Sequence, residues 1–279
     1  MPHVARFAHE DTSDWGFVDG DSVYPARGGT PMPEALADPG LLAEMASSLE
    51  TDPIDLGAVR LLAPIAQPPQ FIGVGLNYRD HAEEAGLDLP ESPVTFGFLC
   101  SSVVGEGDTI EIPTFTNEVD WEAELGIVIG KPGRDIDEKD ALNHVAGYTI
   151  VNDVSARDIQ MSEGQWGRSK SFDSFKPMGP WITPTDVLGD ASGLAISLWV
   201  NDELKQSSTT SELVFKVPEI VSRLSQSATL LPGAVISTGT PHGVGFSRNP
   251  PEFLANGDTV TIEIEGIGRL SNPVAAQAS

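Results

Sequence analysis

Short apolar runs recur along the chain, and glycine, proline, asparagine or aspartate lies between them. In several runs, such as 259–264, apolar and polar residues alternate. Because strand side chains alternate between two faces, this pattern predicts β-strands separated by turns. The runs do not alternate with long amphipathic segments, as the strands of a parallel α/β sheet would. The pattern therefore predicts a mainly β, α+β protein, built as a mixed β-roll or sandwich with short peripheral helices.

Two domains are expected, a small N-terminal domain at 1–65 and a larger domain at 66–279. Prolines are frequent at 64–69, where we place the linker. The small domain is predicted to be α+β, with strands at 4–7, 14–18 and 22–25 and one or two helices within 33–48, and the segment 59–64 ends it. Few polar side chains converge there, so we assign no chemistry to it.

The larger domain is expected to contain most of the strands. We predict strands at 71–75, 93–98, 109–113, 122–129, 144–152, 195–201, 202–206, 235–240 and 259–264. Helices are predicted at 77–86 and, from the spacing of its apolar residues, at 217–226. Asp137 could cap a helical turn at 137–142. The polar stretch 157–168 is expected to form a helix or loop over the site.

Acidic residues lie in or beside two of these strands. Glu122 and Glu124 are two positions apart, and a second apolar run ends at Asp153. Side chains two apart on a strand share a face, so the two glutamates are expected to point the same way. Carboxylates this close repel one another unless a cation lies between them, and oxygen ligands favour Mg²⁺, Mn²⁺ or Ca²⁺ over zinc. The alternative is the solvated face of an edge strand.

Composition restricts the expected partners and compartment. The net charge is −25, with 41 acidic against 16 basic residues. This balance argues against nucleic acid and against anionic membrane surfaces, which both attract basic proteins. No apolar run is long enough for a membrane span or a signal peptide, and the single cysteine, Cys100, suits a reducing compartment. We therefore expect a cytoplasmic protein that acts on a small molecule.

Several common catalytic motifs are absent from the sequence. The chain contains no Gly-x-Ser-x-Gly, no Ser-x-x-Lys, no Gly-x-Gly-x-x-Gly and no Walker A motif. It also has no cysteine or histidine cluster with zinc spacing. These absences weaken the case for a serine hydrolase, a nucleotide enzyme or a zinc protein.

A histidine and a glutamate stand three positions apart in the predicted helix 77–86. On a helix this spacing places His81 and Glu84 on one face. A carboxylate that is hydrogen-bonded to an imidazole orients the ring and raises its basicity, which gives a general base near neutral pH. The alternative is a surface histidine with an ordinary acidic neighbour.

Three other polar residues and one segment could contact a substrate. Lys170 lies in a stretch rich in glycine, serine and aromatic residues, where a semi-buried ammonium could stabilise an enolate; it could equally be a surface lysine. Arg157 and Gln160 could bind substrate oxygens, although Arg157 could be structural. The segment 238–245 offers hydroxyls and free backbone N–H groups for a carboxylate, or is a glycine-rich turn. We assign no role to Asp120 or to the histidine of that segment.

Taken together, these segments resemble the fumarylacetoacetate hydrolase family. The matching stretches lie between Phe71 and about Gly268, in the order found in the family: 75–81, 120–130, 147–160, 170–173, 179–181 and 238–241. The N-terminal domain is similar to that of many bacterial members. The resemblance implies a mixed β-roll catalytic domain of the fumarylacetoacetate hydrolase type, and a homodimer.

The resemblance also implies a role for each matching residue. Glu122, Glu124 and Asp153 match the carboxylates that bind Mg²⁺ or Mn²⁺, with Ca²⁺ as a substitute. His81 and Glu84 match a base and its partner on a segment that closes over the site, and Lys170 matches the catalytic lysine. The positions that match substrate-binding or neighbouring residues are Tyr78, Arg157, Gln160 and Thr240.

These roles imply a metal-dependent hydrolase that cleaves a C–C bond in an acylpyruvate or another 2,4-diketo acid. Water activated by the His–Glu pair would attack the distal carbonyl, and the metal and Lys170 would stabilise the leaving enolate. The stretches 166–170 and 243–246 resemble members that act on diketo sugar acids. The alternatives are an oxaloacetate decarboxylase or a dienedioate isomerase with the same site. A non-catalytic metal-binding module is a further alternative, disfavoured because buried acids without a function are costly.

Overall fold

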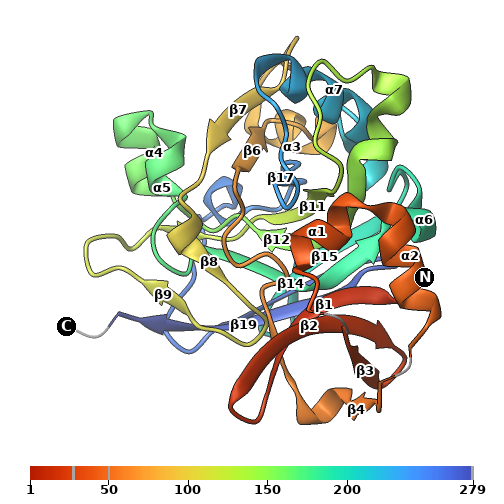
Figure 1. Cartoon of the computed structure of the whole chain (residues 1–279). Coiled ribbons are helices and arrows are strands. Elements are labelled where there is room, and N and C mark those ends of the chain that lie inside the picture. The colour runs from red at the N-terminus through yellow and green to blue at the C-terminus, as the bar shows by residue number, and fades with distance from the viewer. Residues whose placement is uncertain (27–28, 50, 278–279) are drawn as a thin grey trace.

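The computed structural model of the chain describes residues 1–26, 29–49 and 51–277 (Figure 1). Ten strands of the larger sheet follow one another in space as β4 (Ile54–Asp55), β3 (Ser22–Pro25), β2 (Thr12–Asp19), β1 (His3–His9), β14 (Lys176–Pro184), β12 (Val145–Asn152), β11 (Ala123–Ile129), β17 (Val235–Ser237), β6 (Phe71–Gly75) and β7 (Val94–Gly97). Beside this path, β5 (Arg60–Leu62) pairs with β1 and β8 (Val103–Val104) pairs with β14.

A second sheet and a short ribbon complete the strands. The second sheet has the order β16 (Glu203–Thr209), β15 (Ala195–Val200), β18 (Thr259–Ile264), β19 (Gly268–Ala276) and β9 (Ile110–Ile112), and the ribbon pairs β10 (Val119–Asp120) with β13 (Ser155–Ala156). Parallel and antiparallel pairs occur together in both sheets. The predicted class, mainly β with mixed sheets, is confirmed.

The helices are short and lie around the strands (Figure 1). They are α1 (Met32–Ala37), α2 (Pro39–Ser47), α3 (Arg79–Ala85), α4 (Arg157–Glu163), α5 (Trp166–Ser169), α6 (Thr185–Leu188) and α7 (Val217–Ser227). The 3₁₀ helices are η1 (Leu56–Ala58), η2 (Cys100–Ser102), η3 (Glu138–His144), η4 (Thr210–Glu212) and η5 (Gly245–Ser247). Within the residues described, no helix is both long and apolar enough to cross a bilayer.

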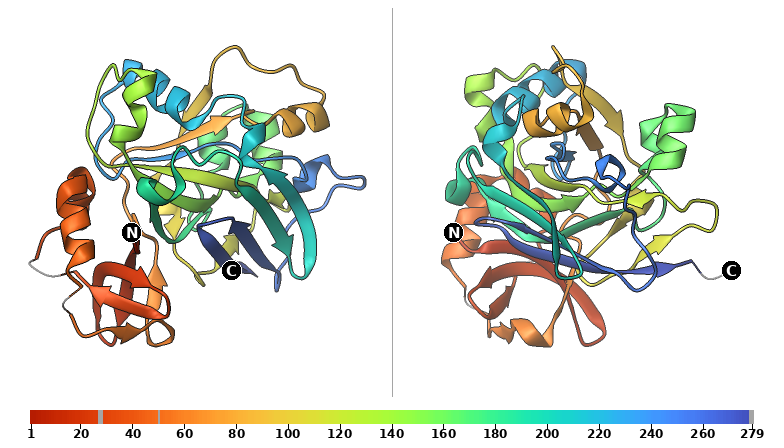
Figure 2. Two further views of the ribbon diagram at one scale, coloured as in Figure 1. Left: turned by 90° about the vertical axis from the view of Figure 1, so that its right-hand side faces the viewer. Right: turned by 180° about the vertical axis from the view of Figure 1, so that it is seen from behind.

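The N-terminal strands and helices lie together at one end of the molecule (Figure 2). They include the elements predicted at 4–7, 14–18, 22–25 and 33–48, and the α2 helix begins where Oδ1 of Asp38 accepts hydrogen bonds from the N–H groups of Gly40 and Leu41. The β1 strand pairs with β14 at Val4 and Ile182, so the larger sheet runs across the predicted boundary at residue 65. The division into 1–65 and 66–279 stays a prediction.

The β11 strand is buried along its whole length, which explains its nearly continuous apolar sequence. Leu125, Ile127 and Ile129 belong to the main core together with residues of the second sheet, whereas Val128 belongs to a second core that also contains residues of β1, β2, α1 and α2. Because strand positions alternate, Glu124 lies on the same face of β11 as Val128. One face of β11 therefore packs in the main core, and the other face carries Glu124, which belongs to the site described below.

Some elements differ from prediction at their ends. The β11 strand begins at Ala123 rather than at residue 122, and β17 ends at Ser237 rather than at 240 because the chain turns at Gly239, whose φ is +97°. Asp137 is the N-cap residue of η3, but its side chain caps no backbone N–H group and instead pairs with Lys139 at 3.4 Å. His144 ends η3 and does not belong to β12.

The glycines of β6 allow aromatic rings to approach its backbone closely. A Cβ on Gly75 would lie 2.2 Å from the ring of Trp166 in α5, and one on Gly73 would lie 2.6 Å from Phe96. The absence of these side chains lets the aromatic rings pack directly against the backbone of β6 at the edge of the site.

Candidate active site

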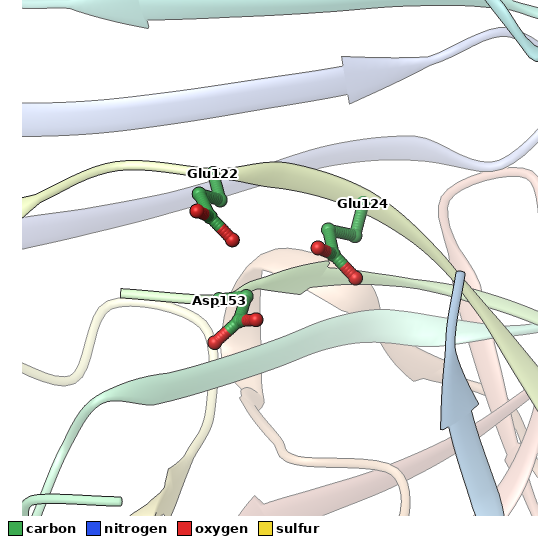
Figure 3. Close-up of side chains that lie close together, drawn as sticks. All are labelled: Glu122, Glu124 and Asp153. Atoms are coloured by element: carbon green, nitrogen blue, oxygen red, sulfur yellow. The ribbon is translucent and has the colours of Figure 1, made fainter. Parts of the chain in front are cut away.

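The carboxylates of Glu122, Glu124 and Asp153 face a common space (Figure 3). In the antiparallel pair of β11 and β12, Ala123 lies opposite Asn152. Glu122, just before β11, therefore faces Asp153, just after β12. Accordingly, the N–H of Asp153 donates to the carbonyl oxygen of Glu122 at 2.9 Å. One oxygen from each of the three carboxylates lies within 4.8 Å of the others, and all three side chains are buried. The structure thus brings together the three acids selected from the sequence.

The electrostatics of Glu124 suit a cation at this point. Burial raises the pKa of Glu124 well above its ordinary value, and the charges of Asp153 and Glu122 raise it further. Its Oε2 accepts hydrogen bonds from the Ser237 hydroxyl and from the N–H of Gly239, at 2.9 Å in the second case. Three buried oxygen donors fit a hard divalent ion, whose charge would offset their mutual repulsion. The residues present therefore fit Mg²⁺, Mn²⁺ or Ca²⁺.

Lys170, just after α5, reaches two of the three acids. Its Nζ donates to Oε2 of Glu122 at 2.6 Å and to Oδ2 of Asp153 at 2.8 Å. Burial alone would lower the pKa of Lys170, but the charges of Asp153 and Glu122 outweigh it and raise the pKa. The side chain therefore stays an ammonium ion inside the site.

A second lysine, which the sequence analysis did not select, contacts the other oxygen of Asp153. Lys176 lies at the start of β14, fully buried, with its Nζ 2.7 Å from Oδ1 of Asp153. It also donates to the carbonyl oxygens of Val154 and Phe175. Burial lowers the pKa of Lys176 to about 8, although Asp153 opposes this change. The available signal was a lysine at the start of a largely apolar run, because lysines are seldom fully buried unless paired.

Arg157 begins α4 and is held by Asp120, to which the sequence analysis gave no role. The Nε of Arg157 donates to Oδ2 of Asp120 at 2.8 Å, one of its terminal nitrogens lies 2.7 Å from Oε1 of Glu122, and the other donates to Oε1 of Gln160 at 2.8 Å. Its guanidinium also stacks 4.5 Å above the Phe246 ring. Burial would raise the pKa of Glu122, but Lys170 and Arg157 outweigh it and lower the pKa. Arg157 thus forms buried ion pairs with Asp120 and Glu122 and also lines the cavity.

His81 and Glu84 form the pair that their spacing predicted. Nδ1 of His81 lies 3.2 Å from Oε2 of Glu84, and their side chains are 10% and 22% exposed. Burial would raise the pKa of Glu84, but the hydrogen bonds from His81 and from the N–H of Gly243 outweigh it and lower the pKa. Glu84 therefore stays ionised, and a proton on Nδ1 of His81 directed to it leaves Nε2 free to accept another.

Most of the site residues predicted from the sequence line one cavity of about 180 Å³. It is lined by His81, Glu122, Glu124, Asp153, Arg157, Gln160, Lys170 and Thr240. Its apolar walls include Leu87, Phe96, Met161, Trp166 and Phe246. Glu84 does not line this cavity and contacts it only through His81. Tyr78 does not line it either: the residue is fully buried, and its hydroxyl has no hydrogen-bond partner among the described residues.

The glycine-rich loop 239–246 binds the protein's own carboxylates. The N–H of Gly239 donates to Glu124, that of Gly243 to Glu84 at 2.9 Å, and those of Gly245 and Phe246 to Asp120 at 2.7 and 3.1 Å. The expectation of free N–H groups for a substrate carboxylate in 238–245 is therefore wrong for Gly239, Gly243 and Gly245. Gly243 has a φ of +96°, and a Cβ there would lie 2.2 Å from the carbonyl oxygen of Lys205, so only glycine fits.

Thr240, in the same loop, keeps a side chain at the cavity. Its hydroxyl accepts a hydrogen bond of 2.9 Å from Nε2 of Gln206, whose Oε1 in turn accepts the N–H of Ala123. This chain of hydrogen bonds fixes the threonine relative to the start of β11.

Comparison with protein families matches nearly the whole chain. A family model described as fumarylacetoacetate (FAA) hydrolase C-terminal matches residues 70–275, and one described as Rv2993c-like, N-terminal, matches residues 3–64. A mitochondrial oxaloacetate tautomerase of Xenopus laevis is 48% identical over 218 residues, which cover 77% of this chain and 68% of that protein.

Solved structures of named enzymes share the fold. The 2-hydroxyhepta-2,4-diene-1,7-dioate isomerase of Mycobacterium marinum superposes with a TM-score of 0.82 at 35% identity, over 100% of both chains. The maleylpyruvate hydrolase of Sphingobium sp. SYK-6, solved with manganese(II) and pyruvate, superposes with a TM-score of 0.83 at 30% identity, over 98% of this chain and 100% of that one.

Proposed function

The chain belongs to the fumarylacetoacetate hydrolase family, and on that basis we propose that it is a divalent-metal-dependent hydrolase that cleaves a C–C bond in an acylpyruvate or another 2,4-diketo acid. One observation carries the proposal. Three buried carboxylates, an ammonium group and an imidazole with its own carboxylate partner surround a single cavity. This set supplies a place for a cation, a group for a developing negative charge and a base.

Glu122, Glu124 and Asp153 would hold Mg²⁺ or Mn²⁺. When bound, such an ion would take the carboxylate and keto oxygens of a 2-oxo acid as ligands and polarise the ketone. The solved maleylpyruvate hydrolase contains manganese and pyruvate, which supports this choice of ion and of substrate end.

His81 is the proposed base. Oriented by Glu84, its Nε2 would take a proton from a water molecule that attacks the distal carbonyl carbon. The C–C bond next to that carbonyl then breaks, its electron pair stays with the 2-oxo acid fragment as an enolate, and the distal fragment leaves as a carboxylic acid. The proton held by His81 can return to the enolate carbon, which closes the balance.

Lys170 is the proposed stabiliser of the enolate oxygen. Of its three N–H donors, two are used by Glu122 and Asp153, and one remains for the substrate. Because the ammonium is buried and held from two sides, it needs little reorganisation when charge develops.

Substrate binding is assigned to Arg157, Gln160 and Thr240, which line the cavity. Tyr78 lies outside the cavity, so its proposed contribution is to support the start of α3 rather than to touch the substrate. The apolar walls at Leu87, Phe96, Met161, Trp166 and Phe246 favour an uncharged distal acyl group. A diketo sugar acid is the more polar version of the same substrate class.

Oxaloacetate chemistry is the second candidate, because the Xenopus relative bears the name of an oxaloacetate tautomerase. Decarboxylation, tautomerisation or isomerisation of a dienedioate would use the same cation, lysine and histidine, with His81 moving a proton to or from carbon and no water attack. The isomerase among the solved structures supports this branch equally.

A substrate panel separates the two candidates. The purified protein, supplied with Mg²⁺ or Mn²⁺, is offered an acylpyruvate with an apolar acyl group, a diketo sugar acid and oxaloacetate. We expect pyruvate and a carboxylic acid from the acylpyruvate. Release of CO₂ from oxaloacetate, or its keto–enol exchange, without acylpyruvate cleavage would replace the first candidate by the second.

We also propose that the protein works in the cytoplasm as a homodimer. The single cysteine is half-buried and donates to the carbonyl oxygen of Pro68, which supports a reducing compartment without disulfides. Leu99 and Phe115 are 64% and 59% exposed, which supports a covering partner surface. Light scattering on the purified protein tests the dimer, and a monomeric mass would reject it.

A further inference from the structure

Asp80 links α3, the helix that carries His81, to two other parts of the chain. Its Oδ2 accepts a hydrogen bond from the hydroxyl of Ser208 in β16 and lies 3.0 Å from Nδ1 of His242. Its Oδ1 lies 3.4 Å from the N–H of His242, in the loop that also holds Glu84. The Asp80 side chain is 21% exposed, so these contacts are partly shielded from water.

Asp80 does not line the cavity, and the proposed chemistry does not use it. It directly precedes His81 on the helix, and neighbouring residues of a helix point about 100° apart. The imidazole therefore turns to the cavity while the carboxylate turns to Ser208 and His242. This arrangement fits a group that holds the helix rather than one that reacts.

The α3 helix needs such contacts because it has only seven residues. Isolated helices of this length are not stable in water. Its other polar attachments are Arg79, which donates to the carbonyl oxygens of Ser211 and Leu213 at 3.2 Å, and Glu84, which accepts the N–H of Gly243. All of them lead to two segments, 208–213 and 242–243.

The same loop connects α3 to the acidic centre. Gly239, three residues before His242, donates to Glu124, and Gly245 and Phe246 donate to Asp120, the partner of Arg157. A shift of the loop would therefore disturb both the helix and the acids that surround the cavity.

We infer that Asp80, together with Ser208 and His242, is a positioning residue that keeps α3 closed over the cavity and so places His81. The kinetic consequence rests on the proposed role of His81; the closing of the helix does not. The hydrogen bond from Gly239 to Glu124 does not involve Asp80, so the acids should still bind Mn²⁺ and oxalate when the helix is released.

Hydrogen exchange tests the inference without reference to turnover. The amides of 79–85 are followed by mass spectrometry in the wild type, in Asp80→Ala and in His242→Ala, each with and without Mn²⁺ plus oxalate. We expect exchange in 79–85 to rise about tenfold or more in both variants, as the loss of a hydrogen bond to a charged group predicts. The double variant should exchange like Asp80→Ala alone, because His242→Ala removes only one of the contacts that Asp80→Ala removes.

The matched control is Glu83→Ala, which changes another acid of α3, one whose exposed side chain has no hydrogen-bond or ion-pair partner among the described residues. Its exchange should equal that of the wild type. Unchanged exchange at 79–85 in Asp80→Ala would overturn the inference, and so would an increase spread over the whole molecule, which indicates general destabilisation.

Kinetics supply the second readout. On a substrate that the wild type turns over, Asp80→Ala should lower kcat about tenfold while metal affinity stays within about twofold, and a loss of metal affinity alone would contradict a positioning role. If the wild type turns over none of the 2-oxo acids, the proposed function fails while the exchange result still decides the inference.

Discussion

The Nζ of Lys176 lies 2.7 Å from Oδ1 of Asp153, while Lys170 donates to the other oxygen of the same carboxylate. Asp153 is 1% exposed, so each of its oxygens meets an ammonium group instead of water. This arrangement fixes the orientation of the carboxylate before any cation arrives. It also makes Lys176 part of the site's charge balance.

Replacing Lys176 should therefore destabilise the metal-free protein. In Lys176→Met, Oδ1 of Asp153 loses its charged partner, which should cost about 1–3 kcal/mol of unfolding free energy. Added Mn²⁺ should recover part of this loss, because it supplies charge at the same carboxylates. Thermal unfolding in chelator and in Mn²⁺ measures both effects. The control is Lys139→Met, an exposed lysine whose one ion pair among the described residues is with Asp137, and equal stability of the two variants would contradict the account.

His81 should matter for turnover and not for metal binding. His81→Ala should lower kcat about 10²- to 10⁴-fold, the usual contribution of a positioned general base. Steady-state kinetics and calorimetric Mn²⁺ titration measure the two properties separately. A variant that loses metal affinity together with activity would show that His81 is a ligand rather than the base.

Metal binding should become tighter as the pH rises. Burial and the neighbouring charges of Asp153 and Glu122 raise the pKa of Glu124, so this carboxyl holds a proton at pH values where an ordinary glutamate does not. A ligand carboxylate must lose that proton, so binding below the raised pKa releases it and affinity falls with falling pH. Calorimetry in buffers of different ionisation enthalpy counts the released protons. Affinity independent of pH, with no proton release, would be the contrary result.

Tyr78→Phe should leave substrate binding unchanged. The Tyr78 hydroxyl is buried without a partner among the described residues, and an unpaired buried hydroxyl costs free energy. Removing it should therefore leave the unfolding temperature unchanged or raise it, and KM should stay within about twofold. A clear rise in KM would show that the hydroxyl contacts the substrate after all.

Local sequence rules were sufficient for the acidic centre. Glu122 and Glu124 are two apart at the start of a strand and Asp153 directly follows the next one, so pairing of consecutive strands brings them together. The same holds for His81 and Glu84, which share one face of a single helix turn. In each case the two side chains meet because they are close in the sequence or because two consecutive strands pair with each other.

The partners of these residues depend on contacts between distant segments. Ser237 reaches Glu124 because β17 lies beside β11, with Gly126 opposite Ser237, an order of strands that no local pattern specifies. Asp120 reaches Arg157 because the strand is interrupted at residues 121–122 and β10 pairs with β13. The use of the loop 239–246 by the protein's own carboxylates is of the same kind, since its N–H groups could be assigned only once their neighbours were known.

The most direct test of the central claim is a crystal structure with Mn²⁺ and oxalate, using the anomalous signal of manganese. The account predicts one anomalous peak bonded to an oxygen of each of Glu122, Glu124 and Asp153 at roughly 2.1–2.3 Å, with both oxalate carboxylates bound to it and Lys170 beside the oxalate. A peak elsewhere, or these three carboxylates turned apart with no metal between them, would contradict it.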